Sequence, residues 1–114
     1  MTDKDPDILT QKKCLPCEVG TRPMDHTRAE SFLSRLSGWE LKDQVKIRKE
    51  FAFDAFGAAI AFVNKVAAIA EKEGHHPSIF ISYNKVRITL STHAIGGLSE
   101  NDFIMAAKID SINV

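Results

Sequence analysis

Residues 78–93 read SIFISYNKVRITLSTH, and this stretch decides the fold class. Apolar or aromatic side chains recur at every second position on both sides of its centre, which is the period of half-buried strands. The residues between the two runs, Tyr83 to Lys85, favour a tight connection. The stretch therefore predicts an antiparallel hairpin, with Tyr83 expected in the core. Its inward face should carry Ile79, Ile81, Tyr83, Val86, Ile88, Leu90 and Thr92, which leaves Arg87, Thr89, Ser91 and His93 on the opposite face.

The residues before the hairpin predict the longest helix of the chain. Asp54 can cap its first turn, and Gly74 can end it because glycine tolerates the left-handed conformation found there. Pro77 prevents the helix from continuing through His76, since the residue before a proline is pushed towards extended geometry. The expected buried stripe consists of Phe56, Ile60, Val63, Ala67 and Ala70, widened by Phe62, Val66 and Ile69.

Further upstream, the pattern predicts a short helix and two short strands. Asp25 or Thr27 can cap a helix that ends near Gly38. Residues 39–53 alternate apolar with polar side chains, which indicates two strands joined around residues 42–44. Trp39, at the start of the first strand, is expected to pack in the core.

Downstream of the hairpin, Gly96 and Gly97 end the second strand. Ser99 and Asp102 have the spacing of a capping box, in which each residue bonds the other's backbone N–H. This predicts a final helix through Phe103, Ile104, Ala107 and Ile109.

The element order favours an α+β fold: a four-stranded antiparallel sheet with three helices packed on one face. Residues 1–24 contain three prolines and show no regular period, so we expect an extended or mobile N-terminal arm before a single domain at residues 25–114. The open sheet edges and the uncovered sheet face favour a homodimer or homotetramer.

Composition excludes several classes of protein. Fifteen basic residues balance fifteen acidic ones, which gives no electrostatic support for direct nucleic-acid binding or for an anionic membrane surface. The longest apolar run, residues 55–70, is too short to span a membrane. Residues 1–7 lack the apolar core of a secretory signal, and two cysteines cannot form a multi-bridge scaffold. We therefore expect a cytoplasmic protein.

Three of the four histidines, His75, His76 and His93, lie within 19 positions, at strand ends that a hairpin brings together. Imidazole both gives and takes a proton near neutral pH, so the cluster predicts a proton-transfer site. Surface histidines without a role are one alternative. A metal site is the other, although adjacent histidines in extended backbone point to opposite sides, which suits chelation poorly.

The run Glu71 to Pro77, EKEGHHP, is followed by Tyr83 six positions after the proline, His93 ten after the tyrosine and Asp102 nine after that. This spaced pattern resembles the signature of the pterin-4a-carbinolamine dehydratase family. Similarity extends from about Trp39 to Ile109, and residues 1–24 fall outside it. A pattern of several spaced elements is more specific than one short motif.

The resemblance implies a 4a-hydroxytetrahydrobiopterin dehydratase, a hydro-lyase without cofactor or metal. Such an enzyme dehydrates the 4a-carbinolamine to quinonoid dihydropterin and so recycles the pterin cofactor of aromatic amino acid hydroxylation. It also implies that His75, His76 and His93 are catalytic. We expect His75 and His93 to form the acid/base pair and His76 to bind and polarise the substrate.

Four further positions match the family pattern as substrate-binding or orienting residues. For Glu71, the alternative is a solvated side chain in the last turn of a helix, and for Asp102 it is the capping role. Tyr83 could line the pterin pocket instead of packing in the core. Pro77 ends the matched run.

Two observations leave other functions open. Cys14 and Cys17 form a Cys-x-x-Cys pair, but a proline-rich setting favours an incidental or packing role over redox or zinc chemistry. Animal relatives of the family also act as dimerisation cofactors of a transcription factor, so an interaction module is a second hypothesis. A pterin-binding relative that serves another pathway, such as molybdopterin metabolism, is a third.

Overall fold

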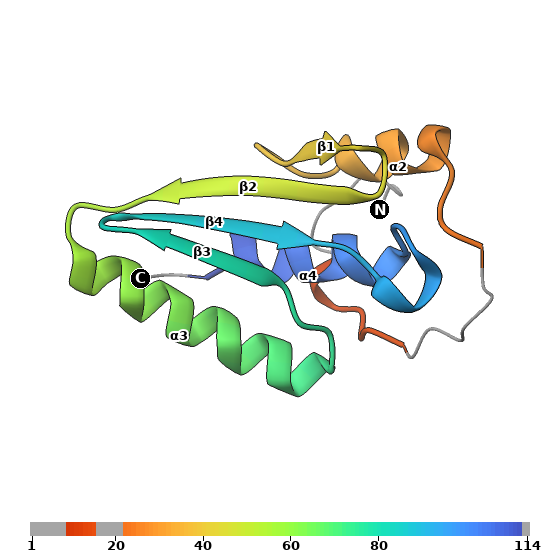
Figure 1. Ribbon diagram of the computed structural model, residues 1–114. Helices are drawn as coiled ribbons and strands as arrows, with labels where there is room; N and C mark the ends of the chain where they lie inside the picture. Colours follow the sequence, from red (N-terminus) through yellow and green to blue (C-terminus); the bar gives the residue numbers. More distant parts are fainter. Residues whose placement is uncertain (1–8, 16–21, 113–114) are drawn as a thin grey trace.

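The computed structural model describes residues 9–15 and 22–112. Figure 1 shows a twisted sheet whose strands are interspersed with helices along the chain. In order they are α2 (His26–Leu33), β1 (Glu40–Lys42), β2 (Lys46–Ala52), α3 (Phe56–Glu73), β3 (Ser78–Ser82), β4 (Lys85–Leu90), the short 3₁₀ helix η1 (His93–Ile95) and α4 (Glu100–Asp110).

The four strands form one antiparallel sheet in the order β1-β2-β4-β3. β4 lies between β2 and β3, with Ile88 opposite Lys49 on one side and Ile79 on the other. The α+β class and the four-stranded antiparallel sheet are thus confirmed. β1 and β3 are left as edges.

The core lies between one face of this sheet and the helices. Val86, Ile88 and Leu90 of β4 are fully buried, whereas Arg87 and Thr89 on the opposite face are only partly buried. Phe62 of α3 contacts Phe51 of β2 with 4.7 Å between ring centroids and so joins a helix to the sheet, whereas Phe32 of α2 stacks on Phe103 of α4 at 5.1 Å and joins two helices. The alternation of apolar residues in the hairpin therefore identified the inward face of β4 correctly.

Helix α3 ends as predicted but begins one residue late. Gly74 has φ +68°, the left-handed C-terminal conformation, and its N–H bonds Ala70 O. The N-cap is Ala55, which makes no side-chain cap bond, so the prediction of Asp54 is wrong. The backbone N–H of Phe53 still bonds the neighbouring turn at Asn84 O, which keeps the chain extended up to this point.

The buried stripe of α3 is rotated from the expected one. Phe56 is 51% exposed and Ala67 is exposed, while the buried side chains are Ala59, Phe62, Val66 and Ala70. A helix rich in alanine and other apolar residues offers two adjacent faces of nearly equal hydrophobicity. The position of the sheet selects one of them.

Helices α2 and α4 begin at the capping residues that the sequence predicts. Asp25 Oδ1 accepts from Arg28 N at 2.8 Å and caps α2, which ends at Leu33 rather than near Gly38. The chain after Leu33 continues in short turns, with Leu36 N bonding Leu33 O. The Ser99 capping box precedes α4 as predicted. Trp39 is buried, as expected, and donates Nε1–H to Asp110 Oδ2 at 2.9 Å.

Tyr83 corrects a prediction. It is 69% exposed and has φ +52°, because it occupies the connection between β3 and β4 rather than the strand itself. A turn residue leaves the pleat, so the alternation that assigns Ile79 to the inner face does not extend to it. Its packing in the core was therefore predicted wrongly.

The described part of the expected N-terminal arm contacts the rest of the fold. Leu9 is fully buried in the core, and Lys12 pairs with Glu100 of α4. The division into a 1–24 arm and a 25–114 domain stays a prediction, and Cys17 lies outside the described residues. Within the described ranges, no helix combines the length and the apolar character of a membrane-spanning segment.

Candidate active site

His75 is held in place by the chain on both sides of it and by a buried carboxylate. Its backbone N–H, like that of Gly74, bonds Ala70 O at the end of α3. Its side-chain Nε2 lies 2.6 Å from Asp102 Oδ1, and the two side chains are 12% and 0% exposed. The short contact orients the ring.

Asp102 is itself fully bonded. Oδ2 accepts from Thr92 Oγ1 at 2.8 Å and from the Ser99 backbone N–H at 3.0 Å. With Asp102 ionised, Nε2 of a neutral His75 carries the proton, and Nδ1 becomes the acceptor on the ring. The carboxylate predicted as a helix cap therefore also contacts a histidine.

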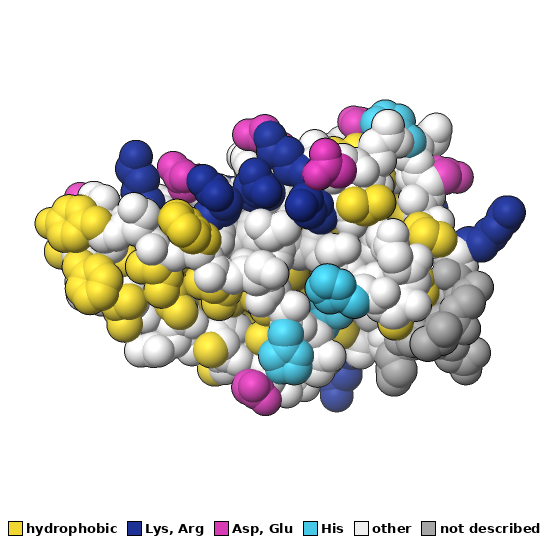
Figure 2. All heavy atoms as spheres, in the orientation of Figure 1, with side chains coloured by type: hydrophobic (Ala, Val, Ile, Leu, Met, Phe, Trp, Pro, Cys, Tyr) yellow, Lys and Arg dark blue, Asp and Glu magenta, His cyan; other side chains and the backbone are white. Residues whose placement is uncertain are grey.

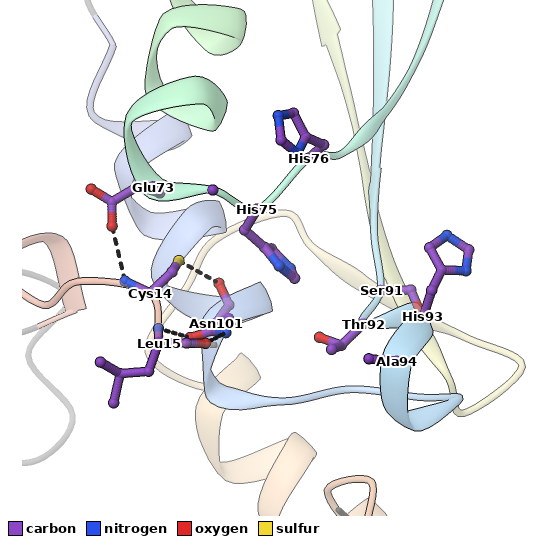
Figure 3. A pocket seen from close by; sticks show the side chains of 11 residues that line it. Cys14, Leu15, Glu73, His75, His76, Ser91, Thr92, His93, Ala94 and Asn101 are labelled. Carbon is purple, nitrogen blue, oxygen red and sulfur yellow. Dashed lines mark hydrogen bonds between the residues drawn. The ribbon is translucent and has the colours of Figure 1, made fainter. Parts of the chain in front are cut away.

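His76 and His93 are more exposed than His75. His76 begins the extended approach to β3, and its Nε2 lies 3.4 Å from Glu71 Oε1, with both side chains largely in solvent. His93 is the first residue of η1, directly after β4 and Thr92. Figure 3 shows the ring of His75 directed into the space between the end of α3 and Thr92, with His93 across that space and the ring of His76 turned away from His75.

A cavity of about 470 Å³ lies among these histidines, within the range of small-molecule sites. Its lining comes from the end of α3, the end of β4, α4 and the N-terminal segment: Cys14, Leu15, Glu73, Gly74, His75, His76, Ser91, Thr92, His93, Ala94 and Asn101. A second cavity of about 360 Å³ on the outer sheet face shares His76, Ser91 and His93 with it. His76 and His93 thus line both cavities, whereas His75 lines the first.

The other predicted site residues differ in position. Glu71 contacts His76 but lines neither of these cavities, and Pro77 also lies outside both linings. Tyr83 lies at the far end of the β3–β4 hairpin, five strand residues beyond His76 and Pro77. The structure thus groups His75, His76, His93, Asp102 and Glu71, and separates Tyr83 from them.

Two polar residues of the cavity carry no signal in the sequence pattern. Glu73 is 4% exposed, pairs with Lys108 Nζ at 3.0 Å and accepts from Cys14 N at 2.9 Å. The backbone N–H of Cys14 and the Lys108 ammonium lower the pKa of Glu73, so it is ionised at neutral pH. Asn101, 7% exposed, bonds Leu15. Their partners lie 35 to 86 positions away, beyond the reach of any local motif.

Among residues 9–15 and 22–112, no group of three or more His, Cys, Asp or Glu side chains is arranged to hold a metal ion. His75 and His76, from the segment after α3, and His93, at the start of η1, line the cavity without forming such a group. The arrangement suits proton transfer to and from an organic molecule better than chelation.

The family model described as pterin 4 alpha carbinolamine dehydratase matches residues 22–112. This chain belongs to that family. The match spans every strand of the sheet, all three histidines and Asp102, and it begins after the Cys14–Leu15 segment.

Similar proteins cover nearly the whole chain. A protein of Nitrosomonas europaea is 47% identical over 105 residues, which are 91% of this chain and 92% of its own. One of Alkaliphilus metalliredigens is 44% identical over 103 residues, 90% of this chain and 93% of its own. Both bear the provisional name pterin-4-alpha-carbinolamine dehydratase.

Two solved structures of the family have similar folds. A transcriptional coactivator/pterin dehydratase from Brucella melitensis superposes with a TM-score of 0.76 at 35% identity, covering 79% of this chain and 97% of its own. A pterin dehydratase-like RuBisCO assembly factor of the alpha-carboxysome gives a TM-score of 0.57 at 29% identity, covering 65% and 87%. Members of one fold thus bear names with different functions.

Proposed function

We propose that this chain dehydrates 4a-hydroxytetrahydropterin to quinonoid dihydropterin. It recycles the pterin cofactor of aromatic amino acid hydroxylases in the cytoplasm. The observation that carries the proposal is the arrangement of three histidines around one cavity, with His75 oriented by the buried Asp102. A family that is named for this reaction supports it.

The reaction needs two proton transfers and no change of oxidation state. The C4a–O bond breaks, the hydroxyl leaves as water after it gains a proton, and the N5–H proton departs as the N5=C4a double bond forms. One protonated imidazole and one neutral imidazole meet this requirement. They return to their starting forms by exchanging protons with solvent.

His75 suits the basic role and His93 the acidic one. Asp102 fixes the Nε2–H form of His75, which leaves Nδ1 to accept the N5 proton, and the carboxylate stabilises the imidazolium that results. His93, more exposed and across the cavity in Figure 3, protonates the leaving hydroxyl. His76, paired with Glu71, binds and polarises the substrate.

The test is a coupled assay in which a hydroxylase generates the carbinolamine and its loss is followed by absorbance. We expect the native protein to accelerate the loss, and His93→Ala or His75→Ala to lower kcat by about 10²- to 10⁴-fold, the usual worth of general acid/base catalysis. His26→Ala, on exposed α2, is the control histidine. No acceleration by the native protein would exclude the proposal.

A second candidate function is an interaction module, because the Brucella relative is named both coactivator and dehydratase. An apolar surface supports it. Phe56, Phe80, Ile81 and Tyr83 are exposed, and Figure 2 shows apolar side chains gathered at the end where β3 turns into β4. Binding of a protein partner that survives His93→Ala and is lost in Phe80→Glu would favour this function.

Pterin binding without turnover would instead indicate a relative that serves another pterin pathway.

A further inference from the structure

The Cys14–Leu15 segment is fastened to the domain by its backbone. Cys14 N donates to Glu73 Oε1 at 2.9 Å, and Leu15 N donates to Asn101 Oδ1 at 2.9 Å, while Asn101 Nδ2 donates back to Leu15 O. Figure 3 shows these bonds as dashed lines at the cavity. The side-chain amide of Asn101 thus bonds both the N–H and the C=O of Leu15, as a neighbouring strand would, and these two bonds fix the position of Leu15.

Buried polar groups make these bonds. Glu73 and Asn101 are 4% and 7% exposed, and the charge of Glu73 is balanced by Lys108. A buried ion pair adds little stability compared with apolar packing, so stability alone does not explain the Glu73–Lys108 pair. Here the carboxylate oxygen that does not bond Lys108 holds the backbone of the N-terminal segment.

The fastening points adjoin the reacting groups. Glu73 is two residues before His75, and Asn101 directly precedes Asp102. Cys14, Leu15, Glu73 and Asn101 line the cavity that the histidines line. In Figure 3 the segment lies on one side of His75, and Thr92 and Ala94 lie on the other. The separation of these two sides sets the width available to a flat ring.

On this side of the cavity, the Cys14–Leu15 segment precedes the residues that the family model matches, whereas Glu73 and Asn101 lie within them. The family model begins at residue 22, and 79% of this chain accounts for 97% of the Brucella structure. The histidines and Asp102 lie within residues 22–112, and the Cys14–Leu15 segment precedes them; the curated relatives match about 90% of this chain, so their similarity extends beyond the residues of the family model.

We propose that the Cys14–Leu15 segment is a substrate-determining wall of the pterin site, and that Glu73 and Asn101 are positioning residues that hold it there. The inference rests on the proposed pterin site. The wall limits the space beside His75 and keeps a bicyclic ring against the acid/base groups. We expect it to act on binding rather than on proton transfer, because the imidazoles and the carboxylate that the proposed reaction uses, those of His75, His93 and Asp102, lie outside the segment.

The kinetic test compares Asn101→Ala, Glu73→Ala and Glu73→Gln in the full chain. Loss of one buried hydrogen bond predicts a rise in KM of about tenfold for the two alanine variants, with kcat within about threefold of native. Glu73→Gln keeps an oxygen for the Cys14 N–H and should keep KM within about threefold of native. If Glu73→Gln raises KM as much as Glu73→Ala does, the loss of the ion pair with Lys108 explains the effect and the bond to Cys14 does not. That result would overturn the inference.

Lys12→Ala is the matched control, since it removes an exposed contact of the same segment with Glu100 and leaves the wall bonds intact. Its KM should equal the native value. An equal rise in KM for Lys12→Ala and Asn101→Ala would overturn the inference, because it would show general loosening of the segment.

A second measurement does not depend on turnover or on the variants' stability. In a Cys17→Ser chain, Cys14 is the single cysteine. We expect 7,8-dihydrobiopterin to slow alkylation of Cys14 by iodoacetamide at least about fivefold, since a ligand bound against the wall covers the thiol. Unchanged alkylation under saturating dihydrobiopterin would overturn the inference. Protection without dehydratase turnover would retain the wall and refute the proposed function.

Discussion

Asp102 illustrates at the residue scale how one side chain serves structure and chemistry together. One oxygen accepts from the Ser99 N–H and Thr92 Oγ1 and so begins α4, while the other contacts His75 Nε2. Both oxygens are held in a site with no solvent exposure. The orientation of the His75 ring is therefore set by the start of α4 as well as by the turn that carries His75.

Asp102→Asn should separate the two roles. Asparagine keeps an oxygen for the Ser99 N–H but removes the charge that faces His75, so we expect kcat to fall about 10- to 100-fold, as for other groups that orient a reacting side chain, with KM within about twofold. The measurement is steady-state kinetics beside thermal unfolding. Glu100→Gln, a more exposed acid in the same turn, is the control. Equal loss of kcat in both variants would contradict a specific role for Asp102.

At the scale of elements, the end of α3 determines where His75 lies. Gly74 adopts φ +68°, and its N–H and that of His75 both bond Ala70 O, which turns the chain from helix to the extended approach to β3. A Cβ on Gly74 would meet nothing within 4 Å, so a substitution there would test backbone conformation alone.

Gly74→Ala should cost about 1 kcal/mol, the strain of a left-handed alanine, and lower Tm by roughly 4 °C. We also expect kcat/KM to fall severalfold because His75 shifts with the turn. Gly57→Ala is the matched control, since Gly57 lies inside α3, has no positive φ and is equally open. Calorimetry should find that variant no less stable than native. Similar destabilisation by the two substitutions would refute the explanation from φ.

At the scale of the whole molecule, we propose that the β3 edge and the apolar end beside it are the surface at which a second copy of the chain binds. Among the strands that the structure describes, β3 pairs with β4 alone, and Phe80 and Ile81 on it are 56% and 38% exposed. Natural sheets cover or charge such edges, and β3 carries no charged residue. Figure 2 shows Lys and Arg side chains over β2 instead, towards the opposite edge of the sheet.

Phe80→Glu should convert an oligomer of native protein into monomer, because a carboxylate would have to be buried against the partner's apolar surface. Arg87, which lies 5.1 Å from the Phe80 ring, can pair with the new charge and preserve the fold. Light scattering after size exclusion measures the mass. Thr27→Glu on α2 adds the same charge far from β3 and should leave the mass unchanged. A monomeric native chain at micromolar concentration would refute this assembly.

The sequence by itself determined the elements whose signals are local. The alternation through Val86, Ile88 and Leu90, the Ser99–Asp102 capping box and the glycine after α3 each depend on residues within one turn or one strand, and each was confirmed. The three histidines were also recognisable, since a hairpin necessarily returns His93 towards the start of β3.

Only the tertiary structure decided which distant segments contact each other and which of two similar apolar helix faces is buried. Local pattern could not tell which apolar face of α3 is buried, nor that Tyr83 occupies a turn, because both depend on where the sheet lies. The bonds from Cys14 and Leu15 to Glu73 and Asn101 span 59 and 86 positions. No periodicity or spacing encodes a contact of that range, since its energy is realised only after the sheet and helices have assembled.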